Sequence, residues 1–105
     1  KSGGFRISPK EIEDLILTLP EVAGCVVIGI PDEIMGEAID AVIQATASDM
    51  ESIKKEIIAL CTTRLPSYKT PKYIDRIEDY PLNSSNKVDR AALRQMILER
   101  RRFTV

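Results

Sequence analysis

The ten residues PLNSSNKVDR, at positions 81–90, place a lysine inside a predicted turn. Proline, asparagine and serine break regular structure, so we expect this stretch to be a loop. Lys87 is then either ordinary surface charge or a cation held at a loop tip, where it can reach a substrate. In the second case it would be an electrostatic clamp that orients anionic groups and neutralises their charge. The spacing alone favours the ordinary surface lysine.

A second candidate stretch is KSGGFR, at residues 1–6. Two adjacent glycines followed by alternating Phe5, Arg6 and Ile7 indicate the returning half of a hairpin whose first strand lies upstream of Lys1. Glycine permits close approach of another molecule to the backbone. We therefore expect a partial hairpin at the amino end.

The sequence contains no histidine, which narrows the possible chemistry. Histidine is the usual general base, and it completes the Ser/His and Cys/His arrangements of nucleophilic catalysis. Cys25 and Cys61 lie in an apolar run and on a predicted helix, without the CxxC spacing of a metal site. We expect both to be core residues and expect no metal site. Any chemistry must come from lysine, arginine, carboxylates or backbone amides.

Length and composition are those of one globular domain. The chain has 105 residues, of which 44% are hydrophobic and 30% charged, enough apolar content for a single core. No apolar run reaches the length of a membrane span, and no cleavable signal pattern opens the chain. We therefore expect a cytoplasmic protein without a membrane span.

Charge is unevenly distributed along the chain, although the net charge is only −1. Residues 31–51 carry six Asp and Glu and no Lys or Arg, whereas residues 87–105 carry six Lys and Arg against two Asp and Glu. A basic end can bind phosphates, but a solvated helix face is the more ordinary explanation. Because the domain is not basic overall and this end lacks interleaved aromatic residues, we expect no nucleic-acid partner.

The first half of the chain is predicted to form one helix and two strands. Ser8, Pro9 and Glu11 have the spacing of a capped helix start, and Pro20 ends that helix. VAGCVVIGI (22–30) and AIDAVIQA (38–45) are apolar runs that we expect to pair antiparallel and to be covered on both faces. The apolar residues of the helix follow helical spacing: Ile12, Leu15, Ile16 and Leu19.

The second half is predicted to contain a helix, a short strand and a last helix. The second helix runs through SDMESIKKEIIALCTTRL, where Ser48 and Glu51 repeat the capping-box spacing. A short strand near residues 73–77 follows, and Asp89 is expected to cap the last helix. In that helix Leu93, Met96 and Ile97 should face inward and the arginines outward. The predicted fold is α+β: a small, mainly antiparallel three-stranded sheet flanked by three helices, with a partial amino-terminal hairpin.

Four segments, in order, resemble the carboxy-terminal domain of the adenylate-forming ligases, the superfamily of acyl-CoA synthetases, peptide-synthetase adenylation domains and luciferases. KSGGFRISPKEIED is similar to that family's hairpin and following helix, and PEVAGCVVIGIPDEIMGEAIDAVI to its two strands around a Pro-Asp loop. LPSYKTPKYI is similar to its Leu-Pro-x-Tyr-x-x-Pro segment, and PLNSSNKVDRAAL to its closing Gly-Lys-Val-x-Arg motif. The chain departs from the family at Asn86, where glycine is usual, and at Thr70, where an apolar residue is usual.

The resemblance implies an ATP-dependent, AMP-forming acid–thiol ligase. Such enzymes join a carboxylic acid to ATP, release pyrophosphate, and pass the acyl group to the thiol of coenzyme A or of a carrier protein's phosphopantetheine. Lys87 would be the catalytic lysine, which contacts the carboxylate and the α-phosphate oxygens during adenylation. After the domain rotates, Gly3 and Gly4 would line the path of the thiol and Arg6 would bind a phosphate of coenzyme A. The alternatives remain a plain hairpin bend for the glycines and an exposed strand residue for Arg6.

On this interpretation residues 1–105 are a single domain, the mobile lid of a larger ligase. The sequence has no phosphate-binding loop rich in Ser, Thr and Gly, so ATP and Mg²⁺ would bind mainly to an amino-terminal domain that is absent here. That domain is one expected partner, and coenzyme A or an acyl carrier protein is the other. The isolated lid should not turn over.

Two points stay open at the level of sequence. Arg6 after two glycines favours coenzyme A as the acceptor, whereas NKVDRAAL and LPSYKTP are similar to domains that load carrier proteins. The alternative function is a stand-alone binding or regulatory module that docks on a carrier protein or a partner synthetase.

Overall fold

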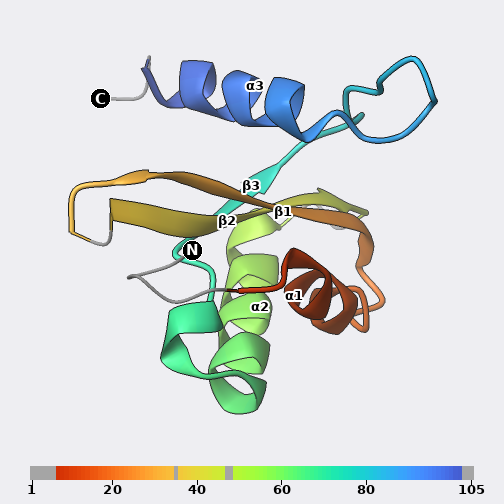
Figure 1. The fold of residues 1–105 in the computed structure, drawn as a ribbon. Coiled ribbons are helices and arrows are strands. Elements are labelled where there is room, and N and C mark those ends of the chain that lie inside the picture. Colours follow the sequence, from red (N-terminus) through yellow and green to blue (C-terminus); the bar gives the residue numbers. More distant parts are fainter. Residues whose placement is uncertain (1–6, 35, 47–48, 103–105) are drawn as a thin grey trace.

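The computed structural model describes residues 7–34, 36–46 and 49–102. The elements are α1 (Pro9–Ile16), β1 (Val22–Asp32), β2 (Gly36–Ala45), α2 (Met50–Arg64), the short 3₁₀ helix η1 (Ser67–Lys69), β3 (Tyr73–Arg76) and α3 (Arg90–Arg102). Figure 1 shows three layers, with the sheet between α3 on one face and α1 and α2 on the other. The predicted hairpin at residues 1–6 lies outside the described residues.

The sheet is mixed, so the prediction of a mainly antiparallel sheet was wrong. Its strand order is β1-β2-β3. The first pair is antiparallel as predicted, with Val27 opposite Ala41, whereas β3 runs parallel to β2, with Ile74 opposite Ala41. Between β2 and β3 the chain passes through α2, and this helical crossover carries the chain from the end of the sheet where β2 stops back to the end where β2 began. The connection therefore dictates the parallel pair.

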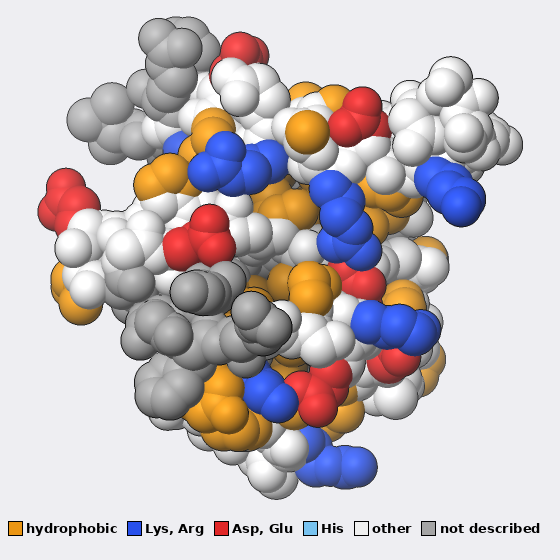
Figure 2. Space-filling view, viewed as in Figure 1, with side chains coloured by type: hydrophobic (Ala, Val, Ile, Leu, Met, Phe, Trp, Pro, Cys, Tyr) orange, Lys and Arg blue, Asp and Glu red, His pale blue; other side chains and the backbone are white. Residues whose placement is uncertain are grey.

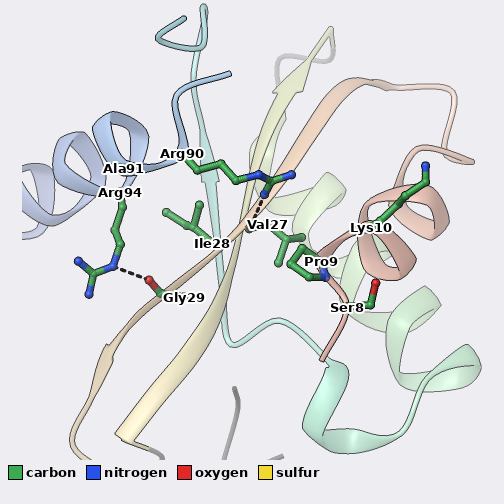
Figure 3. A pocket seen from close by; sticks show the side chains of 9 residues that line it. All are labelled: Ser8, Pro9, Lys10, Val27, Ile28, Gly29, Arg90, Ala91 and Arg94. Atoms are coloured by element: carbon green, nitrogen blue, oxygen red, sulfur yellow. Dashed lines mark hydrogen bonds between the residues drawn. The ribbon is translucent and has the colours of Figure 1, made fainter. Parts of the chain in front are cut away.

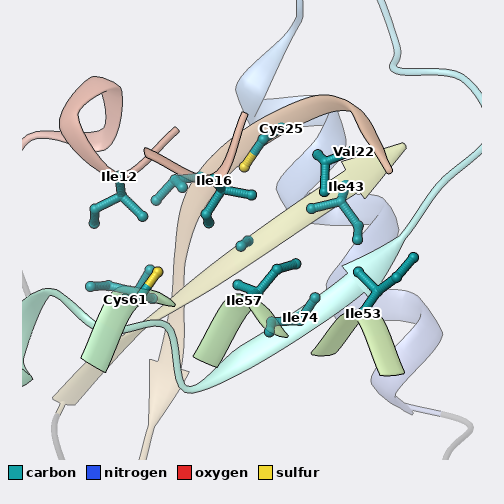
Figure 4. Packing of buried hydrophobic residues seen from close by; sticks show 12 residues of the cluster. Ile12, Ile16, Val22, Cys25, Ile43, Ile53, Ile57, Cys61 and Ile74 are labelled. Atoms are coloured by element: carbon teal, nitrogen blue, oxygen red, sulfur yellow. The ribbon is translucent and has the colours of Figure 1, made fainter. Parts of the chain in front are cut away.

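Both faces of β1 and β2 are covered, as their continuous apolar runs predicted. Successive residues of β1 enter different clusters: Cys25 and Val27 pack under α1 and α2, while Val26 and Ile28 pack under α3. Figure 4 shows the first cluster, in which side chains from α1 and α2 meet the sheet. The helical residues that complete the two clusters are Ile12, Ile16, Ile53, Ile57, Cys61, Leu93 and Ile97. Across the three described ranges, no helix has the length and apolar character needed to span a membrane.

The helices begin close to the predicted positions, but the capping hydrogen bonds differ in part from those predicted. Ser8 is the residue that precedes α1, but its side chain makes no capping hydrogen bond. Asp49 caps α2 by accepting from the backbone N–H groups of Glu51 and Ser52, and the predicted cap Ser48 lies outside the described residues. Asp89 caps α3 as predicted, because its Oδ1 accepts from the N–H of Ala92 at 3.0 Å.

The inward face of α3 is narrower than predicted. Leu93 and Ile97 are fully buried, but Met96 is 42% exposed. The prediction that the arginines face outward was wrong for Arg90 and Arg94, which bend back to β1 and donate to the carbonyls of Val27 and Gly29. It was also wrong for Arg101, which donates to carboxylates on β2 and β3. Long arginine side chains can cover apolar surface with their stems while the guanidinium group reaches a polar partner. Here they attach α3 to the sheet.

Candidate functional site

The loop that carries Lys87 is an ordered turn. The chain leaves and re-enters it through a β-bridge between Leu82 and Val88, and the N–H of Asn83 donates to the carbonyl of Lys87 at 2.8 Å. The side chain of Asn83 fills the turn, because its Oδ1 accepts from the N–H groups of Ser85 (2.8 Å) and Lys87 (3.1 Å). These bonds fix the backbone from which the Lys87 side chain leaves.

Asn86 adopts the left-handed backbone conformation, with a φ of 64°. Glycine is the usual residue for such a position, and asparagine is among the few others that tolerate it. The structure therefore accounts for the departure from glycine just before the lysine. The turn keeps its shape with asparagine at this position.

Lys87 itself is exposed. Within the described part of the chain its ammonium group has no hydrogen-bond or ion-pair partner. The turn projects beyond the start of α3, at the right of Figure 1, between β3 and that helix. A flexible cation on a fixed backbone can approach an anionic ligand without first breaking an ion pair of its own.

The end of the turn is anchored to two other elements. The N–H of Asp89 donates to the carbonyl of Pro81 at 2.8 Å. Arg90 then donates to the carbonyl of Val27 at 2.8 Å and to Oε2 of Glu13 at 3.0 Å. Arg90 thus satisfies one strand carbonyl and one helix carboxylate, and it holds the end of the turn against β1 and α1.

A pocket of about 490 Å³ opens beside this anchor. Figure 3 shows its lining, which comes from the first turn of α1, the middle of β1 and the first two turns of α3. Lys10, Arg90 and Arg94 give it three cationic side chains. Both arginines already donate to strand carbonyls, and Lys10 lies 3.2 Å from Asp14. All three cationic side chains of the pocket thus already have partners, and the two arginines serve mainly to cover the edge of β1.

Charge on the visible face of the molecule is mixed. In Figure 2 the Lys and Arg side chains are interspersed with Asp and Glu and with apolar atoms. No continuous basic stripe runs across this face, in agreement with the net charge of −1.

Three further site residues were predicted at the amino end of the chain. Gly3, Gly4 and Arg6 lie outside the described residues, so their proposed contacts with a thiol or a phosphate stay predictions. Asp32 shapes the loop that follows β1, because it accepts from the N–H of Ile34 and pairs with Lys72.

Glu37 also has a structural role. Its side chain lies against Gly29 of the neighbouring strand, where a Cβ atom would meet Glu37 Cδ at 2.5 Å. Both residues therefore belong to the pairing of β1 with β2.

Both cysteines are buried and unpaired. Burial, and the nearby Glu13 carboxylate, raise the pKa of Cys25 to about 12, and burial raises that of Cys61 to about 11. Because the thiolate is the reactive and metal-binding form, these are core residues, as predicted. Among the described residues no cluster of three or more His, Cys, Asp and Glu could hold a metal ion.

Sequence reasoning missed two buried carboxylates, Glu13 and Asp40. Asp40 is fully buried and is paired with Arg101 at 3.1 Å. A signal was present for Asp40, since a single charge within a strand covered on both faces requires a partner. For Glu13 no such signal exists, because a glutamate beside the apolar stripe of a helix is usually solvent-exposed.

The fold and the site describe a small α+β domain that presents one cationic turn. The family model described as "AMP-binding enzyme C-terminal domain" matches residues 11–87, well over half of the chain. The chain therefore belongs to this family.

Curated relatives agree with this assignment. The chain is 38% identical over 95 residues to the mitochondrial medium-chain acyl-CoA ligase ACSF2 of Mus musculus, covering 90% of this chain and 15% of that protein. It is 37% identical over 94 residues to the long-chain-fatty-acid–CoA ligase FadD13 of Mycobacterium tuberculosis, covering 90% and 18%. The chain thus spans less than a fifth of the length of these relatives.

Solved structures show the same fold. The Mycobacterium tuberculosis fatty acyl CoA synthetase superposes with a TM-score of 0.80 at 38% identity, covering 90% of this chain and 18% of that one. Apo MatB from Rhodopseudomonas palustris superposes with a TM-score of 0.83 at 32% identity, covering 93% and 19%.

Proposed function

We propose that this chain is the mobile carboxy-terminal domain of an ATP-dependent, AMP-forming acyl-CoA synthetase, and that Lys87 is its adenylation lysine. The observation that carries the proposal is the exposed ammonium of Lys87, which has no partner among the described residues, on an ordered turn in a chain of the AMP-binding enzyme C-terminal domain family. The names of its relatives, which are acyl-CoA ligases, support the reaction class.

The role of Lys87 follows from the charges of the reactants. A carboxylate that approaches the α-phosphate of ATP meets a group of like charge. An ammonium group between them orients both and neutralises the charge that develops in the transition state. ATP and Mg²⁺ would be held mainly by an amino-terminal domain, which is the first partner of this one. Lys87 would enter that active site for adenylation and leave it when the domain rotates.

The second half-reaction would use the amino end of the chain. Gly3 and Gly4 would line the path of the thiol, and Arg6 would bind a phosphate of coenzyme A. The relatives favour coenzyme A over carrier-bound phosphopantetheine, since their names specify CoA ligases. The cytoplasmic location stays a prediction.

Product analysis of three proteins tests the proposal. The whole enzyme that carries this domain, the same enzyme without it, and the 105-residue chain alone are each incubated with ATP, Mg²⁺, coenzyme A and a panel of carboxylic acids. We expect the whole enzyme to release AMP and pyrophosphate and to form an acyl-CoA, and the other two proteins to form no acyl-CoA.

Full thioester formation by the enzyme that lacks the domain would contradict the proposal. It would favour the alternative of a separate binding or regulatory module. Tight binding of the chain alone to a carrier protein would point the same way.

A further inference from the structure

The outer edge of β1 is covered at Val27 by two side chains, Glu13 and Arg90. Among the residues that the structure describes, the order β1-β2-β3 gives one side of β1 no partner strand. The N–H of Val27 donates to Oε2 of Glu13 at 2.7 Å, and its carbonyl accepts from Arg90 at 2.8 Å. Exposed edges of this kind are commonly protected by covering side chains.

The two side chains also bind each other. Arg90 donates to the same Oε2 atom of Glu13 at 3.0 Å, so carboxylate, guanidinium and peptide group form one closed set of hydrogen bonds. The Glu13 side chain is only 12% exposed and that of Arg90 is 50% exposed. A buried carboxylate that loses its cationic partner is costly. The arginine is therefore held in place by α1 as well as by β1.

This set of hydrogen bonds holds the residue at which the Lys87 turn ends and α3 begins. Arg90 follows Lys87 by three residues and is the first residue of α3. Between them, Asp89 caps the helix and its N–H is bonded to Pro81, at the opposite end of the turn. The direction in which the turn leaves the domain is thus set by where Arg90 is held. Figure 3 shows Arg90 reaching from the start of α3 to Val27 on β1.

We propose that Glu13 and Arg90 are positioning residues for Lys87. They hold the start of α3 against β1 and α1, so that the turn presents the ammonium group at a fixed position during adenylation. The inference rests on the proposed function, since Lys87 must be the adenylation lysine for its position to affect a rate. A displacement of about 1 Å at a reacting group can reduce a rate on the order of a hundredfold.

The test uses the whole enzyme and four variants. Arg90→Ala and Glu13→Ala remove one partner each. Glu13→Gln keeps an oxygen that can accept from both Val27 and Arg90. Arg101→Ala is the matched control, because it releases the far end of the same helix from Asp40 and Asp75.

Two half-reactions are timed separately: single-turnover adenylate formation, and thioester formation from pre-made acyl-adenylate. Exchange of the Lys87 backbone N–H, which is bonded to Asn83, is measured in parallel. For Arg90→Ala and Glu13→Ala we expect adenylation at saturating substrate to slow on the order of tenfold to a hundredfold, faster exchange at Lys87, and a much smaller loss in thioester formation. Glu13→Gln should recover most of the wild-type adenylation rate. Arg101→Ala should keep both the wild-type adenylation rate and the wild-type exchange rate of the Lys87 N–H.

Three results would overturn the inference. One is that Arg90→Ala and Arg101→Ala slow both half-reactions equally, by the fraction of each variant that is unfolded. Another is unchanged adenylation and unchanged exchange at Lys87 in Arg90→Ala. The third is a Lys87→Ala enzyme that adenylates normally, which would overturn the proposed function as well. The first two results would overturn only the positioning role of Glu13 and Arg90.

Discussion

Arg101, near the end of α3, donates to Asp40 on β2 across a distance of 3.1 Å, and Asp40 is fully buried. The same guanidinium group donates to Asp75 on β3 at 2.7 Å. It also lies over the ring of Tyr73, 4.1 Å from the ring centroid, a favourable arrangement of cation and aromatic face. One arginine therefore fastens the last helix to both strands of the parallel pair.

The Asp40 carboxyl group should make the stability of the domain depend on pH. Burial and the neighbouring Asp75 raise the pKa of Asp40 from 3.8 to about 8, against the opposing effect of Arg101. The folded state then binds this proton more tightly than the unfolded state does, so this group stabilises the fold fully at low pH. Its contribution is lost as pH rises from 3.8 toward about 8.

Denaturant unfolding of the 105-residue chain at pH 5 and at pH 8 measures this effect. Asp40→Asn keeps the shape of the side chain but cannot titrate. We expect the loss of stability between pH 5 and pH 8 to be smaller in Asp40→Asn than in the wild type. An identical pH dependence in the two proteins would show that Asp40 does not titrate in this range.

Asn86 should be replaceable by glycine but not by alanine. Its φ of 64° costs an alanine about 1 kcal/mol, whereas glycine adopts this conformation freely. We expect Asn86→Ala to lower the free energy of unfolding by about 1 kcal/mol and Asn86→Gly to leave it nearly unchanged. Urea denaturation of both variants is the measurement, and equal stabilities would contradict a left-handed residue in the turn.

The two cysteines should be inert in the folded chain. Because the pKa values of Cys25 and Cys61 are raised to about 12 and about 11, almost no thiolate is present at pH 8. We expect iodoacetamide to label neither residue in the native chain at that pH and to label both in urea, as read by mass spectrometry. Rapid native labelling of one residue would place it at the surface.

The elements with a strong local pattern could be predicted from the sequence. The apolar spacing of Ile12 and Ile16 identified the first helix and its buried face. The capping-box spacing of Ser48 and Glu51 identified the second helix. The continuous apolar runs identified two strands covered on both sides. The turn at Lys87 was also predictable, because proline, asparagine and serine define turns through their own backbone preferences.

The direction of β3 and the anchoring of α3 could not be predicted in this way. Four residues of strand do not encode which way they run, and the crossover through α2 decides it. Arg90, Arg94 and Arg101 have the spacing of a solvated helix face, but their partners lie on β1, β2 and β3. Contacts between residues so far apart in sequence follow from packing, which periodicity does not report.

Lys87→Ala in the whole enzyme shows whether Lys87 is the adenylation lysine. Adenylate formation is timed in a single turnover, and thioester formation is timed separately from pre-made acyl-adenylate. Loss of a preorganised transition-state contact costs about 2.7–4 kcal/mol, so we predict that adenylation slows by about a hundredfold or more while thioester formation keeps its rate. Unchanged adenylation by the folded variant would exclude Lys87 as the adenylation lysine.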